Sequence, residues 1–319
     1  MNTAINTKNS EKKKVQKNNL KKINNKVKFG VAGFPLNFFS STFGKKRENI
    51  FAWLESIGLD IIELQCTYGI RMKEEQAILY KKLAQEHNIT LTIHAPYYIS
   101  LASQKKDVVE RSKLEIKKAY DLAKLLGVKR IIFHPGAGYG KTLEDRKEGL
   151  KRLINALNSL KDELDTENIK LYPEIGGKVN QLGSLDEIIE ICKNVSYARP
   201  CIDLAHLHAR ELGSMNSSEK IIKVLKKLEK ELGRKILEET HFHVYPVDYT
   251  EKGEKVHKAF GDKIDNEQLS LFEENSEFMP RAEDYISAIQ KMDLTPITIC
   301  EAHNTQDIGA KLMKDLYFK

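Results

Sequence analysis

The sequence is short of cysteine and of long apolar runs. No stretch of about 18 apolar residues occurs, so we expect no transmembrane helix. The N-terminus also has no apolar core of the kind that a secretory signal needs. Four cysteines, Cys66, Cys192, Cys201 and Cys300, include no CxxC pair, which argues against a disulfide framework and against a thiolate zinc site. Cys66, Cys201 and Cys300 lie in apolar, strand-like runs, so we expect buried, reduced thiols and a cytoplasmic protein.

Excess charge is concentrated in one terminal segment. The formal net charge is +7, but residues 1–25 alone hold seven lysines, one glutamate and no arginine. This Lys/Asn-rich segment has few large apolar side chains and cannot bury enough surface to offset its ordering entropy. We therefore predict a disordered tail over 1–25 and a folded domain over 26–319. Electrostatic attachment of the tail to nucleic acid and a compositional bias without function both stay open, whereas a mitochondrial transit peptide would contain arginine.

Apolar runs and amphipathic segments alternate along the rest of the chain. The amphipathic segments, such as 74–88 and 218–232, carry apolar residues at helical spacing against Lys/Glu faces, and Ser184 with Glu187 predicts a capping box. Eight strand–helix repeats in about 290 residues predict a single (β/α)8 barrel. A doubly wound sheet would usually show a Gly-rich turn after its first strand, and none is present. The strand-like runs are VKFGVAG, DIIELQC, ITLTIHA, RIIFHPG, IKLYPEI, RPCIDLA, THFHVYP and PITICEA.

Six consecutive strand-like runs, from the third to the eighth, end in side chains that bind metals or protons. A lone histidine at a strand end is most often structural, but six such ends would need six separate reasons for placing costly polar groups around one rim. Barrel active sites are built at the carboxyl ends of the strands, so we expect these side chains to meet at one mouth. They are His94, His134, Glu174, Asp203, His206, His243 and Glu301.

The ligand types limit the chemistry. Together with His257, in the polar segment after the seventh strand, they provide five imidazoles and three carboxylates. Imidazole and carboxylate without thiolate suit zinc, manganese or iron. One zinc ion takes about four ligands, so two or three ions that share carboxylates fit better. Such a site would keep a positive charge and attract an anion, for which a phosphodiester is an obvious candidate.

Several motifs resemble those of the endonuclease IV family of apurinic/apyrimidinic endonucleases. The resemblance covers the chain from about Val27 to its C-terminus, and the order and spacing of the motifs carry it. It implies a (β/α)8 hydrolase that cuts the DNA backbone 5′ to an abasic site, leaves a 3′-hydroxyl and acts in base excision repair. The motifs are HAPYYISLAS, FHPGAG, PEIGGKVNQLGSLDEI, CIDLAHLHA, HVYPVDYTEKGEKVH and ICEAH.

The resemblance also implies about three zinc ions, with Mn²⁺ or Fe²⁺ possible at some sites. The family's third ion has a carboxylate ligand two residues before the histidine that His257 matches. That position is Lys255 here, so Glu254 is our candidate, with Asp248 and Asp262 as weaker ones. The implied sets are His94, His134 and Glu174 for the first ion, Glu174, Asp203, His243 and Glu301 for the second, and His206 with His257 for the third.

The choice between two neighbouring histidines, the roles of three other residues and the expected partner follow from the same motifs. His241 and His243 point to the same side of a strand, and spacing favours His243 as the ligand. Glu174 would orient the attacking water, Tyr97 matches a tyrosine that the family pushes into the duplex, and Arg71 is a weaker DNA-binding candidate. The expected partner is double-stranded DNA with abasic sites, and we expect a monomer that binds no membrane. It would lie in the cytoplasm, at the nucleoid, or with nuclear DNA in a eukaryote.

Two other functions compete with the nuclease. One is a sugar or sugar-phosphate isomerase on the related xylose-isomerase-like barrel, where one or two ions are held mainly by carboxylates. The other is an idle barrel that only binds damaged DNA or a small ligand. Metal content separates the three: about three ions per chain for the nuclease, one or two for the isomerase and almost none for the idle barrel.

Overall fold

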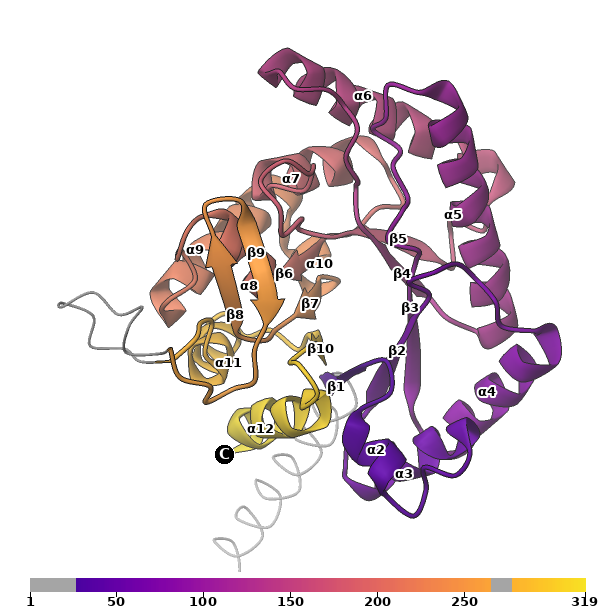
Figure 1. Cartoon of the computed structure of the whole chain (residues 1–319), viewed down its shortest axis with the longest axis vertical. Helices are drawn as coiled ribbons and strands as arrows, with labels where there is room; N and C mark the ends of the chain where they lie inside the picture. The colour runs from indigo at the N-terminus through magenta and orange to yellow at the C-terminus, as the bar shows by residue number, and fades with distance from the viewer. Residues whose placement is uncertain (1–26, 265–276) are drawn as a thin grey trace, which may run out of the picture.

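The computed structural model describes residues 27–264 and 277–319, so the predicted tail over 1–25 lies outside the described residues. Eight parallel strands form one sheet in the order β5-β4-β3-β2-β1-β10-β7-β6 (Figure 1). Parallel bridges Leu171–Ala198 and Glu174–Cys201 join the two end strands. The predicted (β/α)8 barrel is confirmed. The strands are β1 (Lys28–Ala32), β2 (Ile61–Gln65), β3 (Thr90–His94), β4 (Arg130–Phe133), β5 (Lys170–Pro173), β6 (Cys201–Asp203), β7 (His241–His243) and β10 (Ile297–Cys300).

Helices follow the strands and surround the sheet. The capping box of Ser184 and Glu187 is present and opens α7 as predicted. A second capping box, Thr142 with Asp145, opens α6. The helices are α2 (Leu36–Ser40), α3 (Ile50–Ser56), α4 (Glu74–Glu86), α5 (Lys106–Leu126), α6 (Leu143–Ser159), α7 (Leu185–Asn194), α8 (Leu204–Arg210), α9 (Ser218–Leu232), α10 (Arg234–Glu238), α11 (Ala282–Lys291) and α12 (Gln306–Phe318), with 3-10 turns at Arg47–Asn49 and Lys161–Glu163.

The two faces of the strands have different neighbours. Outward-facing residues such as Phe29, Phe133 and Phe242 belong to one large apolar core with the helices. The inward faces contribute only two small apolar clusters, one around Ile61 and Ile299 and the other of Ile132, Tyr172 and Cys201. Because strand side chains alternate between the two faces, polar residues are left to fill the rest of the barrel interior, and this is where the candidate site lies.

The polar segment after β7, which showed no strand pattern in the sequence, is partly regular. It contains an antiparallel hairpin, β8 (Val247–Thr250) with β9 (Gly253–His257), which lies over α8 (Figure 1). Both strands are short and mostly polar, so the apolar alternation that would reveal them in the sequence is missing. The hairpin brings the end of β9 back towards the barrel mouth.

The state of the cysteines and the length and polarity of the helices agree with most of what the composition predicted. All four cysteines are free, and three of them are buried, but Cys66 is only half-buried because it already lies beyond the end of β2. Over the part of the chain that the structure describes, every helix is too short or too polar to cross a membrane.

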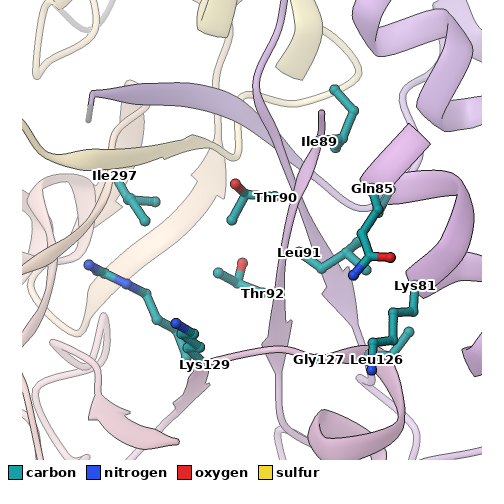
Figure 2. Close-up of a pocket in the computed structure, with 12 residues that line it drawn as sticks. Lys81, Gln85, Ile89, Thr90, Leu91, Thr92, Leu126, Gly127, Lys129 and Ile297 are labelled. Carbon is teal, nitrogen blue, oxygen red and sulfur yellow. The ribbon is translucent and has the colours of Figure 1, made fainter. Parts of the chain in front are cut away.

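A hollow of about 440 Å³ opens at the amino-terminal ends of the strands. Thr90, Thr92, Lys129 and Ile297 are among the residues that line it (Figure 2). Its lining contains no carboxylate and no imidazole. The histidines and carboxylates that the sequence singled out lie instead at the carboxyl ends of the strands.

Candidate metal centre

The predicted ligand residues lie together at the carboxyl ends of the strands. His94 ends β3, Asp203 ends β6 and His243 ends β7, while the others follow β4, β5 and β10 or lie on α8 and β9. Their donor atoms form three groups within which all atoms lie within 4.8 Å of one another. The groups are His94, His134 and Glu174, then Glu174, Asp203, His243 and Glu301, and then His206, Glu254 and His257. Glu174 belongs to the first two groups and is placed to bridge them.

Three of the histidines are oriented by the backbone. In each, Nδ1 lies within hydrogen-bond distance of a carbonyl oxygen, which fixes the ring and leaves Nε2 turned towards the centre. The pairs are His94 with Ala95 at 2.9 Å, His206 with Ile175 at 2.9 Å and His257 with Glu301 at 3.0 Å. This outer partner is what metal-binding histidines usually have.

The inward-facing nitrogens meet carboxylates rather than donors. Nε2 of His94 lies 3.0 Å from Glu174, and Nε2 of His206 and His257 lie 3.1 and 3.0 Å from the two oxygens of Glu254. With Nδ1 donating to a carbonyl, a neutral ring would turn a lone pair towards an anion. Each such pair needs a second proton on the ring or a cation between the two atoms.

The surroundings of a fourth histidine, His134, favour a bound cation over a second proton. Nδ1 of His134 is buried, lies 3.3 Å from Glu174 and has no hydrogen-bond partner among the described residues. Burial lowers the pKa of His134 to about 4, so its ring stays neutral. Neutral imidazole with carboxylate is a donor set that zinc, manganese and iron accept, so the residues present fit divalent ions.

Glu254 reaches the third group through a β-bulge. Tyr249 pairs with Glu254 while Asp248 pairs with Val256, so Lys255 is an extra residue in β9. Residues three apart in a regular strand point to opposite faces, but the inserted residue shifts the alternation. Glu254 and His257 therefore face the same side. Gly177 leaves them room, because a Cβ there would come within 2.4 Å of the Glu254 carboxylate.

The other candidates for the third carboxylate are engaged elsewhere. Lys255 points away from the group, and its Nζ lies 2.8 Å from Asp248. Asp262 accepts a hydrogen bond of 2.8 Å from the amide of Ala259. Among the three acidic residues that the sequence offered, Glu254 alone is in a group of possible ligands.

The structure separates the two histidines of β7. Nδ1 of His243 lies 2.9 Å from Glu174 and 3.6 Å from Glu301, in the second group. His241 lies one pleat deeper, with Nε2 3.1 Å from Glu63. Sequence reasoning missed Glu63, which is fully buried. The available signal was an acidic residue within the apolar run DIIELQC, since a buried charge needs a partner.

A cavity of about 290 Å³ opens over the groups. His94, His134, Tyr97 and Lys178 are among its lining residues. Tyr97 is 57% exposed, and its ring meets the exposed ring of Tyr68 edge-on at 5.9 Å. Arg71 is exposed in the segment after β2 and is not among the lining residues. The mouth of the barrel therefore has the side chain of Lys178 and the rings of Tyr68 and Tyr97 beside the ligand groups.

Residues 51–316 match the model of the xylose isomerase-like TIM barrel family. The chain belongs to this family. An uncharacterized protein of Methanocaldococcus jannaschii is 29% identical over 290 residues, 90% of this chain and 95% of that protein. A probable endonuclease 4 of Halothermothrix orenii is 30% identical over 149 residues, 44% of this chain and 52% of that protein. The chain thus spans about half the length of the endonuclease 4 relatives that it matches.

Solved structures with a similar barrel include a nuclease and a sugar epimerase. Endonuclease IV from Thermus thermophilus has a TM-score of 0.59 at 14% identity, over 90% of this chain and 97% of that one. D-psicose 3-epimerase from Clostridium cellulolyticum has a TM-score of 0.62 at 13% identity, over 91% and 98%. At these identities the likeness shows the fold alone, so the argument for function depends on the site.

Metal binding is expected to release protons. Burial works against the charged form of His94, but the carboxylates of Glu174, Glu63 and Glu301 outweigh it and raise the pKa of His94 to about 9. For Asp203 burial acts in the other direction, because it disfavours the charged carboxylate, and together with the neighbouring Glu174 it raises the pKa of Asp203. At pH 7 the metal-free protein therefore holds protons where an ion would bind, and affinity for the ion should rise as the pH rises towards 9.

Calorimetric titration of metal-free protein with Zn²⁺ in two buffers of different ionisation enthalpy measures this release. In the metal-free protein the raised pKa of His94 stabilises the fold below about 6.5, and that contribution is lost as the pH rises through about 9. Stabilisation by the ion should accordingly grow over the same range. A binding enthalpy independent of the buffer would contradict the prediction.

Proposed function

We propose that this protein is a metal-dependent apurinic/apyrimidinic endonuclease that hydrolyses the phosphodiester 5′ to an abasic site and leaves a 3′-hydroxyl. The observation that carries the proposal is the third ligand group, His206, Glu254 and His257, beside the two groups that share Glu174. A sugar isomerase that binds one or two ions does not require a third ligand group. Three adjacent groups with five imidazoles favour a cluster of about three zinc ions, with Mn²⁺ or Fe²⁺ as alternatives.

The charge and shape of the mouth also favour a nucleic-acid substrate. Four carboxylates among the ligands leave an excess of positive charge once about three divalent ions are bound, which suits a phosphodiester. The exposed rings of Tyr68 and Tyr97 offer stacking surfaces. The probable endonuclease 4 relatives agree with a DNA substrate, although the shared region is only about half of each.

Each part of the site has a role in this reaction. When bound, the ions supply electrophilic assistance to the phosphate and lower the pKa of water. Glu174, buried between two ligand groups, holds the position of the attacking water without forming a covalent bond to the substrate. We propose that Tyr97 enters the duplex at the lesion, where no base stacks and distortion costs least, and that Arg71 lies along the DNA backbone.

Cleavage of a labelled duplex with one tetrahydrofuran abasic analogue tests the proposal. Purified protein with its metals bound and no added magnesium should cut 5′ to the analogue and leave a 3′-hydroxyl, and chelation should abolish the cut. Protein shown to hold its metals that leaves the duplex intact would overturn the proposal. Epimerisation of a ketohexose by the same sample would then identify a sugar enzyme.

Tyr97→Ala is expected to weaken binding of the abasic duplex roughly tenfold, because one stacking contact is lost. Fluorescence anisotropy with metal-loaded protein measures the affinity, and metal content should not change. Phe318→Ala is a matched control, since Phe318 is also exposed but ends α12, at the opposite end of the barrel. Equal losses in both variants, or none in either, would remove Tyr97 from the DNA-binding surface.

A further inference from the structure

We propose that Glu63 is a positioning residue that holds two ligands of the second ion, His243 and Glu301, from inside the barrel. The inference rests on the proposed metal centre but not on the identity of the substrate. Glu63 lies on β2, which provides no ligand to the three groups around Glu174 and Glu254, and its side chain is fully buried.

The outer neighbour of His243 is not a backbone carbonyl, unlike the outer neighbours of the other oriented histidines. His94, His206 and His257 each turn Nδ1 towards a backbone carbonyl and Nε2 towards the centre. His243 is reversed, because its Nδ1 lies 2.9 Å from Glu174 and its Nε2 lies 3.1 Å from Glu63. Glu63 thus occupies the place that a carbonyl occupies behind the other rings.

The same carboxylate reaches a second ligand through one intermediate. The side-chain amide of Gln65 lies 3.3 Å from Glu63 and 3.3 Å from Glu301, and it donates to both. Glu63, Gln65 and Glu301 therefore form a chain from the barrel interior to its mouth. Two of the four possible ligands of the second ion are held by one buried group.

The surroundings of Glu63 suit an acceptor. Thr92 donates a hydrogen bond of 3.0 Å to one oxygen, and His241 lies 3.1 Å from the same oxygen. Gln65 donates to the other oxygen, and Nε2 of His243 lies 3.1 Å from it, so four polar groups surround the carboxylate and two of them, Thr92 and Gln65, donate hydrogen bonds to it.

A carboxylate behind a histidine ligand acts differently from a carbonyl. Its negative charge fixes the proton on the outer nitrogen and makes the inner nitrogen a stronger donor to the ion. The second group would otherwise depend on three carboxylates, Glu174, Asp203 and Glu301, with His243 as its single imidazole. Glu63 therefore sets the affinity of the ion that His243 binds.

A rival reading makes Glu63, His241 and His243 an ion site of their own. Their donor atoms lie within 4.8 Å of one another, and Nε2 of both histidines is buried without a well-aligned hydrogen bond. Thr92 and Gln65 already contact both oxygens of Glu63, however, which leaves little room for an ion. The two readings differ in the number of ions that the protein binds.

The test is titration of the full-length, metal-free chain with Co²⁺, followed by visible absorption. Glu63→Gln keeps the size of the side chain but removes its charge. We expect the variant to bind as many ions as the unaltered protein, with one ion held roughly 10- to 100-fold more weakly and its absorption bands shifted. Gln65→Leu, at an exposed position, removes only the link to Glu301 and should weaken the same ion by a smaller factor.

Thr298→Val is the matched control, since Thr298 is fully buried on β10 and bonded to Tyr285 at 2.7 Å, outside the barrel interior. It should lower thermal stability without changing Co²⁺ affinity or spectrum. Unchanged affinity in both Glu63→Gln and Gln65→Leu would overturn the proposal, as would loss of one whole ion in Glu63→Gln with the others unaffected. Protein that binds Co²⁺ as expected but does not cut abasic DNA would instead contradict the proposed function alone.

Discussion

Replacing Glu174 by glutamine is expected to abolish incision of abasic DNA, with a loss of roughly a thousandfold or more. Glu174 is the one side chain shared by the first two ligand groups, and its oxygens lie 3.0 Å from His94 and 2.9 Å from His243. Glutamine has nearly the same shape but cannot bridge two cations with a negative charge. Metal content should fall from about three ions towards one, because the third group does not include Glu174.

Incision of the tetrahydrofuran duplex and elemental analysis of the dialysed variant give the two readouts. Glu148→Gln provides the control, since Glu148 is half-exposed on α6 and pairs with Lys151, one helical turn away. It should keep full activity and metal content. If Glu174→Gln retained either wild-type activity or all its ions, Glu174 could not be the bridging carboxylate.

Glu254→Gln is expected to lower metal content and incision, whereas Lys255→Gln is expected to change neither, although the two residues are neighbours in β9. Glu254 lies between His206 and His257, so its loss should remove one ion and lower incision about a hundredfold. Lys255 pairs with Asp248 on the other side of the hairpin and should be replaceable with little effect on either quantity. The contrast follows from the bulge that places one residue inside and the next outside.

Deletion of Lys255 tests the role of the bulge directly. Deleting Lys255 would place a carboxylate two residues before the histidine in a regular strand, which is the spacing that the endonuclease IV resemblance implies. Because residues two apart face the same side, this deletion variant should keep the third ion. Loss of that ion in Lys255→Gln, or its retention in Glu254→Gln, would show that the carboxylate comes from elsewhere.

Much of the barrel could be predicted from local patterns. Eight apolar runs separated by amphipathic segments are visible in the sequence because a strand needs few residues to show its pattern and a helix repeats its pattern several times. The strand-end histidines and carboxylates stood out because barrel chemistry is confined to one rim. Family membership followed from motifs in the right order, and the match over residues 51–316 supports it.

The hairpin and the deeper polar network could not be predicted in the same way. The strands β8 and β9 are short, and the bulge at Lys255 depends on pairing between two strands. Glu63 lies in a run that looks like an ordinary core strand, and its partners come from β3 and β7, far away in the sequence. The spacing and composition of the sequence do not predict that Glu63 lies close to these residues.

The sequence by itself determined the repeating strand–helix architecture and the kinds of ligand available, because periodicity and residue chemistry are local properties. Which atoms meet depends on the tertiary structure. Glu254 and His243 were preferred from the sequence over Asp248 and His241, but only the folded chain shows that Glu254 lies beside His206 and His257 and that His243 faces Glu174. The position of Glu63 behind His243 had no counterpart in the sequence analysis. The physical reason is that closing the barrel and pairing the hairpin set distances between residues that are remote in the chain. Those distances determine which groups can share an ion.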